Sequence, residues 1–155
     1  MPYEQLKLDN QLCFRLYTVS RLVIQAYRPY LEPLGLTYPQ YLVLMILWEE
    51  DHQLVNSIAH RLYLESNTMT PLLQRMEKEG LVERKKSKED GRQTLVSLTD
   101  KGRKLEEQAK DVPSCLMSCI YGKGVQSDEL MPLFNPIDQL INALSKDDKA
   151  SADSK

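Results

Sequence analysis

The chain has 155 residues, a formal net charge of −2 and an isoelectric point near 5.7, which is one domain's worth of sequence with room for a hydrophobic core. No run of about eighteen apolar residues occurs, which excludes a membrane-spanning helix, and the polar first residues lack the apolar run of a signal peptide, which predicts a cytoplasmic location. Three cysteines, an odd number, argue against a disulfide framework: Cys13, Cys115 and Cys119.

The charge is distributed unevenly along the chain. Residues 75–104 carry a net charge of +4, whereas residues 1–74 carry −2 and residues 105–155 carry −4. A basic segment between two acidic ones is expected if only part of the surface contacts a polyanion such as nucleic acid. A solvated, charged hairpin without a partner would show the same pattern, so charge alone leaves both open.

The first third of the chain has the periodicity of helices. Apolar residues recur at three- and four-residue steps over residues 8–31, where Pro29 should bend or end the helix. After a short loop, the sequence TYPQ predicts a capping box, with Thr37 as the N-cap and Gln40 reaching back to it. The run that follows, residues 41–50, is apolar on nearly all sides and predicts a central, buried helix.

Two shorter helices are expected at about 56–63 and 67–79. Pro71 is tolerated only in a first turn, so the second helix should start near Ser66–Thr68, and Gly80 should end it in the left-handed conformation. Its buried stripe would be Met69, Leu72, Leu73 and Met76. Its solvent face would carry small hydrogen-bonding groups and one arginine: Ser66, Asn67, Thr68, Thr70, Gln74 and Arg75.

From residue 81 the spacing of apolar residues changes from the helical period to a period of two, as in a β-strand. Residues 81–87 and 93–99 flank a turn containing Asp90-Gly91, which is a strong hairpin signal. Basic side chains surround that turn: Arg84, Lys85, Lys86, Lys88 and Arg92.

Helical patterns return after the hairpin. Thr99 should cap a helix that extends to about residue 110, Pro113 should interrupt or restart the pattern, and a last helix is expected at roughly 127–145. The polar tail, residues 146–155, is expected to be disordered.

A helix-turn-helix followed directly by a β-hairpin is the winged-helix arrangement, so the predicted fold is mainly α with a small β-hairpin wing. The second helix of such a lobe enters the major groove, and the hairpin reaches the backbone or the minor groove. Arg92, directly after the tight turn, is best placed for a narrow minor groove. The predicted DNA-binding residues are Ser66, Asn67, Thr68, Thr70, Gln74, Arg75, Arg84, Lys86, Lys88, Asp90 and Arg92.

The segment LYLESNTMTPLLQRMEKEGLVERKKSKEDGRQTLVSLTDKG, residues 62–102, closely resembles the winged-helix core of the MarR family of bacterial transcription regulators. LDNQLCFRLY and LGLTYPQYLVLMILWE resemble its organic-hydroperoxide-sensing, OhrR-type branch. The resemblance implies one MarR-type domain over residues 1–145, with dimerisation helices at about 5–34 and 100–145 and a DNA-binding lobe at about 37–99. It also implies a homodimer, a pseudo-palindromic double-stranded operator and no cofactor.

The resemblance further implies that Cys13 senses the hydroperoxide and that Tyr27 and Tyr38 are its partners. A sensor thiolate must be stabilised, because an ordinary thiol is only about 3% ionised at pH 7, and phenol hydroxyls can donate to it. Tyr27 lies fourteen residues beyond Cys13, about 21 Å along a continuous helix. The two could meet only if antiparallel helices of a dimer bring one subunit's Cys13 to the partner's Tyr27 and Tyr38.

In this mechanism the hydroperoxide converts Cys13 to a sulfenic acid, which condenses with another thiol, and the operator is released. The second thiol is either a low-molecular-weight thiol or a resolving cysteine. Cys119 and Cys115 are candidates, since their four-residue spacing puts them on one helix face. They could equally be small buried interface residues. A zinc site is not expected, because only His52 and His60 could assist them.

Two rival functions remain. A MarR-type repressor gated by a small phenolic or other ligand would keep its response in a Cys13→Ser variant. A cytosolic thiol peroxidase would use Cys13 catalytically, but the chain has no thioredoxin-like pattern and no CxxC motif. We therefore predict a repressor rather than an enzyme.

Overall fold

A computed structural model describes residues 3–152 of the chain, and side chains up to residue 145. The chain forms two compact units, Met1–Val112 and Pro113–Lys155, and each is considered by itself. None of the described helices combines the length and the apolar character that crossing a bilayer requires.

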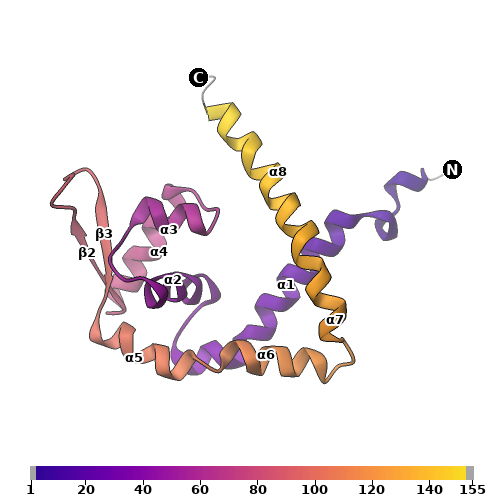
Figure 1. Ribbon diagram of the computed structural model, residues 1–155, viewed down its shortest axis with the longest axis horizontal. Coiled ribbons are helices and arrows are strands. Elements are labelled where there is room, and N and C mark those ends of the chain that lie inside the picture. Colours follow the sequence, from indigo (N-terminus) through magenta and orange to yellow (C-terminus); the bar gives the residue numbers. More distant parts are fainter. Residues whose placement is uncertain (1–2, 153–155) are drawn as a thin grey trace. The chain divides into compact units, whose positions relative to one another are not determined.

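The first unit begins with an arm made by helix α1, Leu12–Leu31, which leads into the lobe (Figure 1). Two short 3₁₀ turns, Glu4–Leu6 and Leu8–Asn10, precede it. The predicted start at residue 8 is therefore four residues too early, because Gln11 is extended and its side-chain amide donates to the Gln5 carbonyl oxygen at 2.7 Å. Pro29 lies in the last turn of α1, and the helix ends two residues later, followed by a 3₁₀ turn at Glu32–Leu34.

Helix α2, Tyr38–Glu49, is the centre of the lobe. The predicted capping box is confirmed, with the Thr37 backbone N–H donating to Gln40 Oε1 at 2.9 Å. The central position is confirmed as well, because α2 supplies a large part of the buried core: Tyr41, Val43, Leu44, Ile46 and Leu47. The helix is not buried all round, since Met45 is 42% exposed.

The helix-turn-helix consists of α3, Val55–Arg61, and α4, Ser66–Lys78. The predicted start of α4 and the left-handed Gly80, with a φ of 74°, are confirmed, but Pro71 is the sixth residue of α4 and not in the first turn as predicted. Because proline has no N–H, α4 lacks one internal hydrogen bond at this position. The four apolar residues of the predicted stripe are all buried: Met69, Leu72, Leu73 and Met76.

The wing is the antiparallel pair β2, Val82–Lys86, and β3, Thr94–Leu98, in which Arg84 lies opposite Val96. Figure 1 shows this ribbon reaching past α3 and α4. A two-residue strand, β1, Gln53–Leu54, pairs with β3, so the sheet order is β1-β3-β2. The sequence did not predict β1, because two residues are too few to show an alternating pattern.

Helix α5, Asp100–Ala109, follows the wing and is capped by Thr99, whose Oγ1 accepts from the Gly102 N–H at 3.0 Å. The same hydroxyl donates to the Gly80 carbonyl oxygen at 2.6 Å. The start of α5 is therefore hydrogen-bonded to the turn that joins α4 to the wing.

The second unit is helical. Helix α6, Val112–Tyr121, restarts the helical pattern with Pro113 in its first turn, as expected. The single helix expected at 127–145 is instead three elements: α7, Ser127–Leu130; a 3₁₀ turn, Met131–Leu133; and α8, Phe134–Ala152. Pro132 falls in the 3₁₀ turn, where a proline cannot donate the hydrogen bond that would continue α7.

The backbone of α8 stays helical to Ala152, beyond the predicted end at residue 145. The disordered tail predicted for residues 146–155 lies outside the described side chains, and residues 153–155 lie outside the described backbone.

Candidate DNA-binding surface and thiol-sensing site

The solvent face of α4 has the composition that the sequence predicts. All six polar residues assigned to it are exposed, while the apolar stripe faces the core. These exposed residues are Ser66, Asn67, Thr68, Thr70, Gln74 and Arg75. The face can therefore donate to phosphates and read base edges without disturbing the core.

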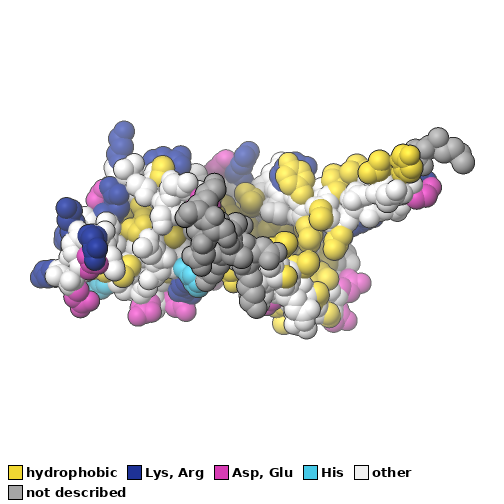
Figure 2. All heavy atoms as spheres, turned by 90° about the horizontal axis from the view of Figure 1, so that it is seen from above, with side chains coloured by type: hydrophobic (Ala, Val, Ile, Leu, Met, Phe, Trp, Pro, Cys, Tyr) yellow, Lys and Arg dark blue, Asp and Glu magenta, His cyan; other side chains and the backbone are white. Residues whose placement is uncertain are grey.

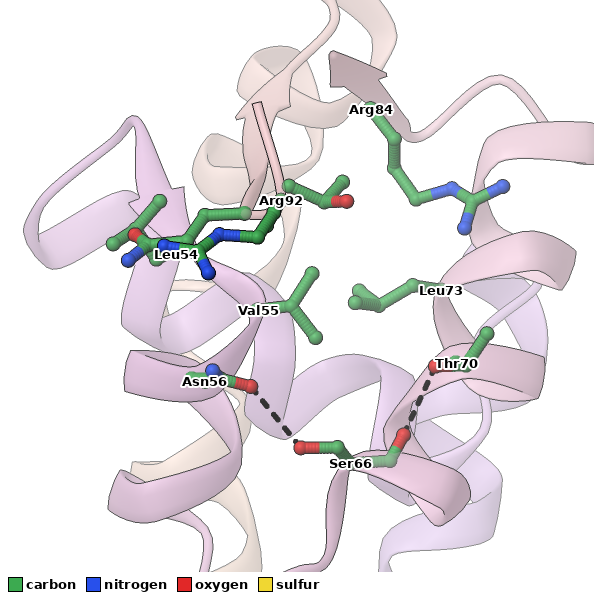
Figure 3. A pocket seen from close by; sticks show the side chains of 10 residues that line it. Leu54, Val55, Asn56, Ser66, Thr70, Leu73, Arg84 and Arg92 are labelled. Carbon is green, nitrogen blue, oxygen red and sulfur yellow. Dashed lines mark hydrogen bonds between the residues drawn. The ribbon is translucent and has the colours of Figure 1, made fainter. Parts of the chain in front are cut away.

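Part of this surface is already ordered by internal hydrogen bonds. Ser66 Oγ donates to Asn56 Oδ1 at 3.1 Å, and Thr70 Oγ1 donates to the Ser66 carbonyl oxygen at 2.9 Å (Figure 3). Between these helices and the wing lies a hollow of about 200 Å³, where Val55 and Leu73 point toward each other. The hydroxyl protons at the start of α4 are thus used within the protein, and their oxygen lone pairs remain available to a ligand.

The wing presents basic side chains to solvent at the end of the lobe (Figure 2). Lys86 and Lys88 are exposed, and the Arg92 side chain is 93% exposed. Asp90 accepts from the Arg92 backbone N–H at 3.0 Å and from its Nε at 3.2 Å. Asp90 therefore shapes the turn and orients Arg92, while the charged end of Arg92 remains accessible to a polyanion.

Arg84 differs from the other basic residues of the wing. Its Nε and Nη2 donate to Glu77 Oε2 at 3.0 and 2.8 Å, and its backbone N–H donates to Glu77 Oε1 at 3.1 Å. The Arg84 side chain is only 23% exposed, and its hydrogen bonds lower the pKa of the Glu77 carboxyl. Arg84 therefore joins β2 to helix α4. Its place in a basic cluster of the sequence did not indicate this role.

Three tyrosines meet where the arm enters the lobe. The ring centroids of Tyr27 and Tyr38 are 4.8 Å apart, and those of Tyr27 and Tyr41 are 5.9 Å apart. Burial, together with the neighbouring Tyr38 and Tyr41, raises the pKa of Tyr27 to about 12. Burial also raises the pKa values of Tyr38 and Tyr41. The raised pKa values favour the protonated phenol, the form that can donate a hydrogen bond.

Cys13 is exposed near the beginning of α1, at the opposite end of the helix from Tyr27. Because α1 is continuous from Leu12 to Leu31, the fourteen-residue separation corresponds to about 21 Å. A single chain therefore does not bring Cys13 to its own tyrosines. In the second unit, Cys115 and Cys119 are both exposed on α6.

Comparison with known proteins agrees with this architecture. A family model described as transcriptional regulator SarA/Rot matches residues 25–109. The organic hydroperoxide resistance transcriptional regulator of Bacillus subtilis (strain 168) is 48% identical over 128 residues, which cover 83% of this chain and 87% of that protein. The chain belongs to the MarR family of winged-helix transcription regulators, in its OhrR-type branch.

Solved structures of AbfR of Staphylococcus epidermidis share both the fold and much of the sequence. Reduced AbfR bound to DNA is 42% identical, with a TM-score of 0.77 over 93% of this chain and 99% of that one. The disulfide form of AbfR is 43% identical, with a TM-score of 0.60 over 89% of this chain and 95% of that one. A further AbfR structure shows the overoxidised protein bound to DNA.

Both terminal helices of this MarR-family chain expose apolar side chains. On the arm these are Leu12, Phe14, Val19, Leu22 and Ile24, and Figure 2 shows hydrophobic side chains along it. On α8 they are Phe134, Ile137, Leu140, Ile141 and Leu144. Exposed apolar patches of this kind are typical of interaction surfaces.

Sequence reasoning missed a carboxylate that holds this MarR-type wing to its lobe. Asp51 Oδ1 accepts from the backbone N–H groups of Leu98 and His52 at 2.9 and 2.8 Å, and Oδ2 lies 2.5 Å from Arg103 Nη2. Burial of Asp51 works against ionisation, but these N–H groups and the charges of His52 and Arg103 outweigh it and lower its pKa. In the sequence, Asp51 is marked only as part of a polar break between two apolar segments, which does not indicate a buried contact.

Among the described residues, no group of three or more His, Cys, Asp or Glu side chains is placed to hold an ion. His52 instead has its Nδ1 2.7 Å from Ser97 Oγ.

Proposed function

We propose that this chain is a homodimeric repressor that binds a pseudo-palindromic operator and releases it when an organic hydroperoxide oxidises Cys13. The observation that carries the proposal is the pair formed by Tyr27 and Tyr38, whose ring centroids are 4.8 Å apart, in a chain whose Cys13 lies fourteen residues before Tyr27 on the same continuous helix. The similarity to an organic hydroperoxide resistance regulator and to DNA-bound AbfR supports it.

A two-fold dimer resolves the separation of cysteine and tyrosines. If the α1 helices of two subunits run antiparallel, each Cys13 approaches the Tyr27–Tyr38 pair of the other subunit, and symmetry builds the site twice. The exposed apolar residues of α1, and separately those of α8, are suited to burial against a partner subunit. The same symmetry presents two recognition helices to two operator half-sites.

The first chemical step needs only the thiolate and the peroxide. The Cys13 sulfur attacks the terminal peroxide oxygen, the O–O bond breaks, and the alkoxide takes a proton and leaves as an alcohol. The sulfenic acid then reacts with a second thiol to form a disulfide and water. The tyrosine hydroxyls donate to the thiolate in the reduced state, and the bulkier disulfide displaces them.

The second thiol comes from Cys119 or Cys115 of this chain, both of which are exposed, or from a low-molecular-weight thiol. We place the loss of DNA binding at the disulfide step. AbfR, which has been solved bound to DNA in its reduced and overoxidised forms and separately in a disulfide form, supports this order.

The test is titration of the protein onto its own promoter DNA at fixed salt, before and after treatment with an organic hydroperoxide and a small thiol. The wild type should release DNA, whereas Cys13→Ser should stay bound, and Cys115→Ser and Cys119→Ser identify the resolving thiol. Release of DNA by Cys13→Ser, or retention of DNA by the oxidised wild type, refutes the proposal.

A second candidate, gating by a small ligand, is favoured by one feature. A hollow of about 260 Å³ next to Tyr38 is lined mainly by apolar side chains, together with Thr37, Arg28 and Glu32. Arg28 Nε lies 3.9 Å from Glu32 Oε1, so an anionic phenolic compound would have to compete with Glu32 for Arg28. This candidate predicts that a phenolic carboxylate lowers the DNA affinity of wild type and Cys13→Ser equally.

A further inference from the structure

Gln40 is the one buried polar side chain in the described part of the chain, with 4% of its surface exposed. Both ends of its amide are used. Oε1 accepts from the Thr37 backbone N–H at 2.9 Å, and Nε2 donates to Glu79 Oε2 at 2.8 Å. A capping box needs only the first of these bonds, so the second needs another explanation.

The bond from Gln40 to Glu79 joins two functional elements. Gln40 lies in the first turn of α2, two residues after Tyr38. Glu79 is the C-terminal cap of the recognition helix α4. The contact therefore links the helix that carries a tyrosine of the sensor pair to the helix that faces the DNA.

The other end of α2 is attached to the wing side of the lobe. Trp48 Nε1 donates to the Gly102 carbonyl oxygen of α5 at 2.9 Å, and the Trp48 ring packs against Tyr41 at 6.2 Å. Lys101 Nζ of α5 in turn donates to the Glu79 carbonyl oxygen at 2.8 Å. Helix α2 is therefore hydrogen-bonded near its first turn to the end of α4 and near its last turn to α5.

We propose that Gln40 is a positioning residue that transmits the state of the sensor tyrosines to the recognition helix through its hydrogen bond to Glu79. This inference rests on the proposed function. A hydrogen bond to a carboxylate is strong, and breaking this one leaves the buried Gln40 amide unsatisfied. The contact therefore favours two discrete arrangements over gradual loosening, as a switch requires.

The contact can be cut without destroying the cap. Gln40→Glu keeps an oxygen for the Thr37 N–H but turns a second carboxylate oxygen toward Glu79. Glu79→Met removes the acceptor from an exposed position and leaves the core untouched. The double variant Gln40→Glu/Glu79→Gln exchanges donor and acceptor and can re-form the bond. Glu107→Met, which removes an exposed carboxylate of α5, is the control for loss of charge.

The measurement is the ratio of the operator Kd of the oxidised protein to that of the reduced protein, at fixed salt. Couplings of this kind change such ratios by roughly threefold to thirtyfold, so the ratio should fall by that factor in Gln40→Glu and Glu79→Met. It should return toward the wild-type value in the double variant and stay unchanged in Glu107→Met. The mass of intact protein should show Cys13 oxidised at the wild-type rate in every variant.

An unchanged ratio in both single variants overturns the inference, and so does a double variant that remains as uncoupled as Gln40→Glu. Failure of the proposed function looks different, because Cys13→Ser would then respond to hydroperoxide as the wild type does.

Discussion

Replacement of Gly102 by alanine tests how tightly α5 is packed on the root of the wing. A Cβ atom built on Gly102 would lie 2.2 Å from the Leu81 carbonyl oxygen and 3.1 Å from Leu98 Cδ2. Ordinary contacts begin near 3.4 Å, so α5 must move away from β2 by roughly 1 Å. The Gly102 carbonyl oxygen also accepts the Trp48 hydrogen bond, which such a movement would strain.

The expected loss follows from opposing contributions. Alanine in a helix is favoured over glycine by about 0.5–1 kcal/mol. Overpacking costs about 1–3 kcal/mol, and a lost hydrogen bond costs about 0.5–1.5 kcal/mol. The net change is a loss of about 2 kcal/mol of unfolding free energy, which lowers the Tm of a domain of this size by roughly 4–8 °C.

Thermal unfolding followed by circular dichroism measures this change, and the fluorescence of Trp48, the single tryptophan of the chain, reports the same contact. The matched control is Gly91→Ala, since nothing lies within 4 Å of a Cβ at that position and its stability should change by less than about 0.5 kcal/mol. A Gly102→Ala protein with a Tm equal to or above that of the wild type would refute the packing argument.

Three further predictions concern the wing and the sensor. The pKa of Asp51 is lower in the folded chain than its ordinary value of 3.8. Its ionised form therefore contributes stability that is present above about pH 3.8 and is lost as the pH falls through the lower folded pKa. Urea unfolding at a series of pH values should show a weaker loss of stability in that acid range for Asp51→Asn than for the wild type. Arg92→Ala should weaken operator binding about tenfold and reduce the slope of log K against log salt concentration by about one. Arg84→Ala should mainly lower the unfolding temperature, because the Arg84 side chain is bound by Glu77. Tyr27→Phe should slow hydroperoxide oxidation of Cys13, measured by intact mass, while the operator affinity of the reduced protein stays within about twofold.

Local sequence signals predicted most of the fold, because each depends on a few neighbouring residues. The capping box at Thr37, the left-handed Gly80 and the hairpin around Asp90-Gly91 are all confirmed. The predicted helix bounds are wrong where a second local interaction competes with the helical pattern. The start of α1 shifts because Gln11 caps a preceding turn, and the last predicted helix is divided at Pro132.

The exposed candidates of the site were also predictable, since small polar residues opposite an apolar helical stripe must face solvent. The buried polar contacts were not. In the sequence, Arg84 is one of several basic residues of the wing, and Asp51 belongs to a polar break between two helices. Their roles depend on partners elsewhere in the chain, which the local sequence does not indicate.

Gln40 shows why such contacts escape sequence reasoning. Its spacing from Thr37 fully explains one of its hydrogen bonds, so nothing in the local pattern calls for a second. The partner of the second bond, Glu79, lies 39 residues away and is an ordinary exposed glutamate by every local criterion. The opposite holds for Cys13 and Tyr27, whose separation along one continuous helix is set by helix geometry alone. The proposal that a partner subunit brings Cys13 to the tyrosines therefore needs only helix geometry and the family resemblance, whereas the proposed path from the tyrosines to α4 depends on contacts that only the folded chain shows.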